Sequence, residues 1–148
     1  MEISTPGRIC LFGEHLDYLG LPVIAMAISL RMSIKGTYRS DNMIKVFMPD
    51  LNEIKVFCLD ELNYKNKNYF KSGLKICKKA GLNFSRGMNC QIKSDIPISA
   101  GTSSSSAMNV GWINFLSKMA DKPLKLNPNQ IAEMAYQAEV EEFNESGG

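Results

Sequence analysis

A run of small and hydroxylated residues offers the clearest chemistry in the chain. Residues 96–107 read IPISAGTSSSSA, between a predicted strand and a predicted helix. Small side chains let a phosphate approach the backbone, and the unpaired N–H groups of a helix's first turn stabilise an anion. A serine hydroxyl can also ligate Mg²⁺, which prefers oxygen. The segment is no Walker A motif, because no lysine follows its glycine. Its spacing fits a nucleotide-phosphate site or, equally, a serine-rich loop that caps a helix.

A second polar cluster follows a short apolar run near the N-terminus. Residues 6–20 read PGRICLFGEHLDYLG, with Arg8 before the apolar run and Glu14, His15 and Asp17 after it. Carboxylates and an imidazole at a strand end can accept hydrogen bonds from the hydroxyls of a small ligand. The alternative is a polar turn that joins two strands.

The elements that must position these residues begin with strands. Apolar runs bounded by turn-forming residues predict them over 9–12, 23–27, 30–34, 44–47, 54–57 and 89–93. Five predicted strands come first, a helix and a sixth strand follow, and two more helices come last. This order predicts an α+β domain, with a mixed β-sheet and helices packed on one face.

Three helices are predicted from apolar spacing and end signals. The first begins near Tyr69 and ends at a cap on Gly81, the second runs from the serine run to about Ala120, and the third begins at Asn127, with Gln130 placed for a capping box. The lysines of the first helix lie mainly opposite its apolar side, which favours a solvated face over an anion-binding one. They are Lys71, Lys75, Lys78 and Lys79.

Composition narrows the class of protein. The chain has 148 residues, 45% hydrophobic and 22% charged, with a net charge of +2. We therefore expect one globular domain, with neither nucleic acid nor a membrane as partner. The N-terminal sequence is not that of a signal peptide, so a cytoplasmic location is predicted. Four scattered cysteines indicate reduced thiols, and His15 as the single histidine excludes a histidine-rich metal site.

Taken together, the two polar segments resemble motifs of one kinase superfamily. Residues 6–18 resemble the galactokinase opening motif P-G-R-x-x-x-x-G-E-H-x-D-Y, and residues 97–106 resemble the GHMP phosphate loop P-x-x-x-G-x-S-S-S-A. The superfamily includes galactokinase, homoserine kinase, mevalonate kinase and phosphomevalonate kinase. The resemblance implies a GHMP kinase N-terminal domain over 1–148, with a fold like domain 2 of ribosomal protein S5. It also implies ATP-dependent phosphorylation of galactose or a related sugar at the anomeric hydroxyl.

The resemblance implies a role for each matched residue. Arg8 would stabilise charge on the transferred phosphoryl group, because a guanidinium stays protonated and cannot be the base. Glu14, His15, Asp17 and Gly148 would contact the sugar. The segment Gly101, Thr102, Ser103, Ser104 and Ser105 would wrap the ATP phosphates. Ser105 and Glu139 would ligate Mg²⁺.

Some positions depart from the family pattern or remain open. Leu16, Leu19 and Leu21 differ from the usual residues, which leaves the sugar unidentified. Ser99, Thr102 and Ser106 also differ, but they stay small or polar, so phosphate binding is still expected. On a helical wheel Glu142 lies nearer the centre of the third helix's apolar stripe than Glu139 does, and only the family register selects Glu139.

The chain stops before the segment in which the family carries its catalytic aspartate. We therefore expect a domain truncated ahead of that aspartate, with the C-terminal domain absent and little turnover by the chain alone. Two alternatives are a non-catalytic sugar- and ATP-binding regulator, and one piece of a split kinase whose partner is the C-terminal half.

Overall fold

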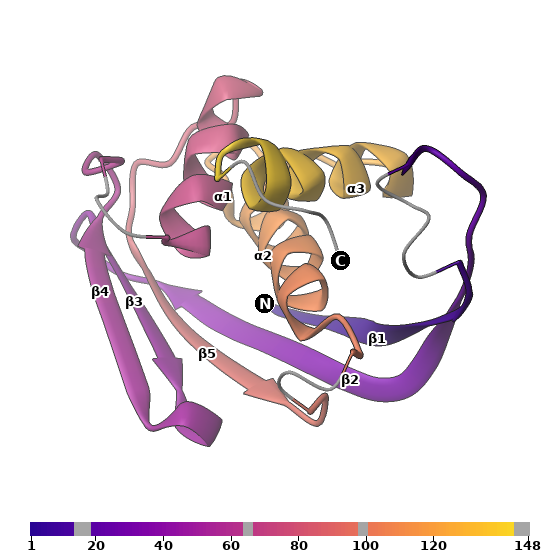
Figure 1. The fold of residues 1–148 in the computed structure, drawn as a ribbon. Coiled ribbons are helices and arrows are strands. Elements are labelled where there is room, and N and C mark those ends of the chain that lie inside the picture. The colour runs from indigo at the N-terminus through magenta and orange to yellow at the C-terminus, as the bar shows by residue number, and fades with distance from the viewer. Residues whose placement is uncertain (14–18, 64–66, 98–100, 144–148) are drawn as a thin grey trace.

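A computed structural model describes residues 1–13, 19–63, 67–97 and 101–143. Five strands form one sheet in the order β1-β2-β5-β3-β4, and the helices lie together on one of its faces (Figure 1). The strands are β1 (Glu2–Phe12), β2 (Ile24–Tyr38), β3 (Met43–Met48), β4 (Glu53–Cys58) and β5 (Met88–Ser94). The helices are α1 (Tyr69–Lys79), α2 (Ser104–Met119) and α3 (Pro128–Tyr136), with a 3₁₀ turn η2 (Pro49–Leu51) and a π-helical turn η3 (Gln137–Glu141). The predicted α+β fold is confirmed.

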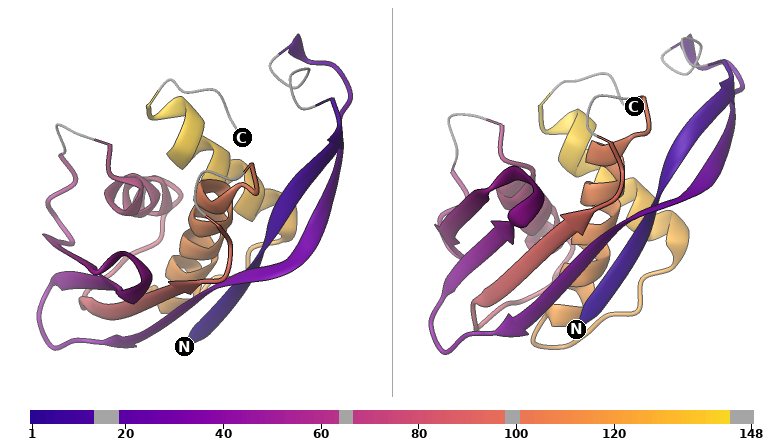
Figure 2. Two further views of the ribbon diagram at one scale, coloured as in Figure 1. Left: turned by 60° about the horizontal axis from the view of Figure 1, so that its bottom comes forward. Right: turned by 90° about the horizontal axis from the view of Figure 1, so that it is seen from below.

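The sheet is mixed, and its two faces differ in burial. Strands β3 and β5 are parallel, while the other neighbouring pairs are antiparallel. Along β3, Ile44, Val46 and Met48 are buried, whereas Lys45 between them is exposed. This alternation places every second side chain against the helices. Figure 2 shows the open face of the sheet opposite them.

Strand β2 joins the two predicted runs 23–27 and 30–34 into one strand. Arg8 of β1 pairs with Ala27, but Pro6 pairs with Arg31, so the register shifts between them. The interruption that suggested two strands is therefore a bulge within one strand. Beyond it, β1 and β2 form a curved ribbon that extends past the helices (Figure 1) and exposes apolar side chains such as Phe12 and Ile24.

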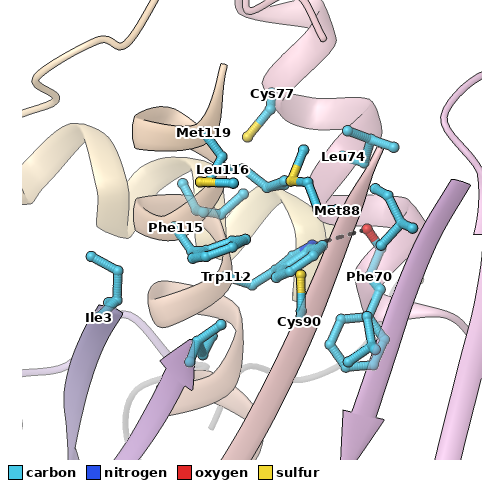
Figure 3. Packing of buried hydrophobic residues seen from close by; sticks show 14 of the residues in the cluster. Ile3, Phe70, Leu74, Cys77, Met88, Cys90, Trp112, Phe115, Leu116 and Met119 are labelled. Carbon is cyan, nitrogen blue, oxygen red and sulfur yellow. Dashed lines mark hydrogen bonds between the residues drawn. The ribbon is translucent and has the colours of Figure 1, made fainter. Parts of the chain in front are cut away.

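Trp112 on α2 lies at the centre of the core (Figure 3). Its Nε1–H donates a hydrogen bond of 3.0 Å to the carbonyl of Phe70, whose ring meets the indole edge-to-face at 5.3 Å. Phe115 stacks on the indole at 5.6 Å. A Cβ on Gly73 would lie 2.6 Å from Trp112 Cδ1, so a glycine on α1 is what lets the two helices approach.

The predicted helix ends are confirmed. Gly81 follows α1 with φ of +89°, and the N–H groups of Gly81 and Leu82 donate to Lys78 and Cys77 in a Schellman motif. At α3, Asn127 and Gln130 form the reciprocal capping box, with both hydrogen bonds at 2.9 Å. No helix within the described ranges is long and apolar enough to cross a membrane.

The lysine face of α1 was predicted wrongly. Lys71 is buried and pairs with Glu61 at 3.1 Å, and Lys78 pairs with Asp60 at 3.2 Å. Lys75 pairs with Glu142, beyond η3. The long lysine stems pack along the protein surface while their ammonium groups reach carboxylates on other elements. Lys71, Lys75 and Lys78 therefore do not form a freely solvated face, whereas Lys79 is exposed as predicted.

All four cysteines carry free thiols, as predicted. Two of them belong to the core, and burial raises the pKa of Cys77 and Cys90 to about 12. Both thiols therefore remain protonated at neutral pH.

Asp41, in the turn between β2 and β3, gives a testable pH dependence. Its carboxylate accepts hydrogen bonds from Arg39 at 2.6 and 2.7 Å and from the Met43 amide at 3.1 Å, and these lower its pKa to about 2. Because the folded-state pKa is depressed, this stabilisation is present above the unfolded-state pKa and is lost as pH falls through the folded-state value. We expect Asp41→Asn to lower the melting temperature at pH 6, with the difference from wild type disappearing near pH 2. A constant difference across that range would contradict the assignment.

Candidate functional site

The serine run opens directly into α2, as predicted. Helix α2 begins at Ser104, and its N-cap residue Ser103 has a left-handed backbone with φ of +52°. Gly101 is also left-handed, with φ of +68°. The side chain of Ser103 makes no capping hydrogen bond, whereas asparagine side chains cap α1 and α3. The Ser103 side chain therefore leaves the N–H groups of Ser104 and Ser105 to other acceptors, and the helix dipole favours an anion there.

The backbone of Arg8 connects β1 to this loop. Its N–H donates a hydrogen bond of 3.2 Å to the carbonyl of Thr102, whose Oγ1 donates in turn to the carbonyl of Pro97 at 3.1 Å. Among the described residues, no carboxylate pairs with the Arg8 guanidinium. Arg8, from the first polar segment, therefore contacts the serine loop through its backbone.

A pocket of about 330 Å³ extends from the serine run to the start of α1. Its lining comes from β2, β3, η2, β4, α1, β5 and α2, and is mostly apolar, with charged side chains at three positions. The lining residues are Met32, Met48, Asp50, Leu51, Glu53, Lys55, Tyr69, Phe70, Ile92, Ser94, Ile96, Ser104, Ser105 and Met108. Its volume and mainly apolar character are those of a small-molecule site.

Sequence reasoning identified only the two serines of this pocket. The other lining residues come from several elements and share no local motif. The pocket lies where the first turn of α2 leaves part of the sheet face uncovered, and this arrangement becomes apparent only after the strand order is known.

The structure distinguishes Glu139 from Glu142. Glu139 is buried and lines a hollow of about 160 Å³ together with Ser106 of α2. Glu142 is occupied by Lys75. A helical wheel assumes the α-helical period, whereas residues 137–141 form a π-helical turn with more residues per turn, so the wheel loses phase at this point.

The environment of Glu139 suits a cation. No lysine or arginine among the described residues pairs with its carboxylate, although the side chain is only 9% exposed. A buried carboxylate without a counter-charge is costly. Ser106, in the same hollow, directly follows Ser105 in the first turn of α2. The hollow therefore offers one carboxylate and one hydroxyl oxygen, the ligand type that Mg²⁺ prefers, whereas Ser105 lines the apolar pocket instead of this hollow.

That donor set is small. Within the described part of the chain, no three His, Cys, Asp or Glu side chains gather as a metal site. These residues therefore do not form a metal site from protein ligands alone, and phosphate oxygens would have to complete the coordination of Mg²⁺. The sugar-contact residues predicted from the sequence, Glu14, His15, Asp17 and Gly148, lie outside the described residues.

Residues 68–148, more than half of the chain, match the family described as the GHMP kinases N terminal domain. The chain belongs to the GHMP kinase family. Residues 2–36 also match the galactokinase galactose-binding signature. The two matched regions contain the two motifs that the sequence offered, so the predicted family is confirmed.

Relatives in the GHMP kinase family include sugar kinases and a mevalonate kinase. A galactokinase of Haemophilus influenzae is 32% identical over 84% of this chain and 33% of its own length. The mevalonate kinase of Methanocaldococcus jannaschii is 34% identical over 95% of this chain and 47% of its own length. The chain thus spans about a third to a half of the length of the curated relatives it matches.

Solved structures of GHMP kinases share the fold. The galactokinase of Lactococcus lactis, solved as a complex with galactose, superposes with a TM-score of 0.82 at 27% identity, over 99% of this chain and 39% of that one. The mevalonate kinase of Methanococcus jannaschii gives 0.86 at 28% identity, over 99% and 48%. The mixed sheet and one-sided helical layer are therefore those of GHMP kinase N-terminal regions.

Proposed function

We propose that this chain forms the ATP-binding and sugar-binding part of a Mg²⁺-dependent sugar kinase. The reaction would transfer the γ-phosphoryl group of ATP to the anomeric hydroxyl of galactose or a related sugar. The observation that carries the proposal is the start of α2. There, a loop with left-handed Gly101 and Ser103 is hydrogen-bonded to the backbone of Arg8, and Ser104 and Ser105 of the first helical turn line an apolar pocket.

Each part has a physical task in phosphoryl transfer. The N–H groups of residues 103–105 hold the β- and γ-phosphates at the positive end of the α2 dipole. The apolar pocket receives the nucleoside, because its wall joins Ser104 and Ser105 to Tyr69 and Phe70. When bound, Mg²⁺ offsets phosphate charge, and Ser105 and Glu139 would hold it. Arg8 stabilises the charge that develops on the transferred group.

The proposed sugar contacts lie within residues 2–36. The galactose-binding signature covers Arg8, Glu14, His15 and Asp17. Carboxylates and an imidazole recognise hydroxyl groups by paired hydrogen bonds, and such sites discriminate strongly against analogues that lack a hydroxyl. These four residues are accordingly proposed as the sugar contacts and the charge-stabilising arginine.

A second acceptor is favoured by one comparison. The mevalonate kinase relative is 34% identical to this chain, slightly more than the galactokinase at 32%. Mevalonate carries a primary hydroxyl and a carboxylate, and its recognition would call for a cation where a sugar calls for acceptors. The signature over residues 2–36 makes the sugar the leading proposal.

ADP release by the intact protein tests the function. The assay contains ATP and Mg²⁺ with galactose, other hexoses or mevalonate as acceptor, and EDTA as the metal-free control. We expect turnover with a hexose that disappears with EDTA. Turnover with mevalonate alone would replace the sugar by the second acceptor. Nucleotide and sugar binding without turnover would identify a regulator instead.

A further inference from the structure

The hydrogen-bonding pattern of helix α3 changes from α-helical to π-helical just before Glu139. After Tyr136 the helix continues as the π turn η3, and the N–H of Glu142 donates to the carbonyl of Gln137, five residues back. A π turn holds one residue more than an α turn and is less favourable in isolation. Contacts from outside the helix are therefore needed to hold it, and they decide where Glu139 points.

Helix α1 supplies such contacts from one face. The hydroxyl of Ser72 donates a hydrogen bond of 2.6 Å to the carbonyl of Ala138, and both residues are fully buried. One turn before it, Tyr69 meets the ring of Phe143 edge-to-face at 5.4 Å. One turn after it, Lys75 pairs with Glu142. Residues three apart share a helix face, so Tyr69, Ser72 and Lys75 form one row that contacts the π turn and the residues that follow it.

Ser72 has the central place in this row. Its partner, the carbonyl of Ala138, belongs to the residue that directly precedes Glu139 in the π turn. A buried carbonyl that loses its donor carries a desolvation penalty, so the turn would rearrange to find another partner. Any such rearrangement moves Glu139, because the two residues share a peptide unit.

The surroundings of Glu139 are consistent with a fixed position. Its side chain lies in the hollow with Ser106 and Val110 of α2. On the other side, the residue that precedes it accepts the hydrogen bond from Ser72 of α1. The turn that carries Glu139 thus packs against both α1 and α2.

We propose that Ser72 is a positioning residue whose hydrogen bond to Ala138 fixes the π turn and so presents the Glu139 carboxylate to a divalent cation. The inference rests on the proposed function, in which Glu139 ligates the metal. It adds a residue that lies outside both recognised motifs and that would act without touching the metal or the nucleotide.

The test is Ser72→Ala in the intact protein, with Mn²⁺ as the probe. Mn²⁺ affinity in the presence of ADP is measured by electron paramagnetic resonance. Loss of an outer residue that orients a metal ligand typically costs about 10- to 100-fold in affinity. We expect about a 10-fold weaker Mn²⁺ affinity, and a loss of kcat/KM at low Mg²⁺ that higher Mg²⁺ partly restores.

Ser117→Ala is the matched control. Ser117 is likewise a buried helical serine, and its hydroxyl donates to a backbone carbonyl, that of Asn114 at 2.8 Å, within α2. It should lose similar stability and keep Mn²⁺ affinity. Equal Mn²⁺ affinity in Ser72→Ala, Ser117→Ala and wild type would overturn the proposal.

Two further measurements cover the remaining outcomes. If Ser72→Ala does not fold, amide hydrogen exchange is followed in the wild-type protein. Slower exchange at 139–142 with Mn²⁺ and ADP than with ADP alone supports the proposal, and no difference overturns it. Glu139→Gln tests the metal role of Glu139 separately from the positioning role of Ser72. Unchanged Mn²⁺ affinity in that variant would overturn the metal role in the proposed function, and the role of Ser72 with it.

Discussion

Glu139→Gln is expected to lower kcat/KM for phosphoryl transfer by about 10²- to 10³-fold in the intact protein, the range found when one group that stabilises transition-state charge is removed. Glutamine keeps the shape of the side chain and removes its charge. The residue is buried and has no lysine or arginine partner among the described residues, and under the proposed function its counter-charge is the Mg²⁺ that the variant would hold less well. The measurement is steady-state ADP release as a function of Mg²⁺.

Glu141→Gln provides the matched control. Glu141 lies in the same π turn, but its side chain is exposed. Removing its charge should change kcat/KM by less than about 2-fold, since surface charges contribute little. Similar losses in the two variants would mean that the net charge of the turn matters rather than a ligand. An unchanged Glu139→Gln variant would remove Glu139 from the site.

Trp112→Ala is expected to have the largest effect on folding. Replacing a buried tryptophan by alanine typically costs about 3–5 kcal/mol, because apolar contacts are lost and a cavity remains. Here the indole is fully buried, lies between the rings of Phe70 and Phe115, and is bound to the Phe70 carbonyl (Figure 3). Urea denaturation followed by circular dichroism gives the free energy of unfolding.

Trp112→Phe separates packing from hydrogen bonding. Phenylalanine preserves an aromatic ring beside Phe115 but removes the indole donor to the Phe70 carbonyl, which keeps only its partner within helix α1. The loss of one such hydrogen bond costs about 0.5–1.5 kcal/mol. Its free energy of unfolding should therefore fall between those of wild type and Trp112→Ala. A variant as unstable as Trp112→Ala would show that the hydrogen bond dominates.

The fold could be predicted largely from local patterns. Apolar runs bounded by turn-forming residues marked strands such as β3, and the asparagine and glycine caps marked the helix ends, because these signals depend on residues close in sequence. The single strand β2 could not be read from its two apolar runs. Only its pairing with β1 reveals that the gap between them is a bulge.

Motifs predicted one structural feature of the candidate site, the serine run that opens directly into α2. The contact of this loop with β1, through the hydrogen bond from the Arg8 N–H to the Thr102 carbonyl, is seen only in the folded chain. The lysines of α1 were misjudged, since their carboxylate partners come from other elements. Glu139 could not be selected by helical periodicity, because the period itself changes within η3. Ser72 carries no sequence signal at all, and its partner is 66 residues away.

Strand β1 also bears on how chimeras between family members could be built. It passes the core at Ile3 and the serine loop at Arg8, then continues into a ribbon whose side chains are mostly exposed at Leu11 and Phe12. A graft that exchanges residues 10–25 would join at the Cys10–Ala25 pair, where the two strands are in register. Such a graft would carry the proposed sugar contacts Glu14, His15 and Asp17 as one segment, and it would leave the buried residue Ile3 and the serine loop of the recipient unchanged.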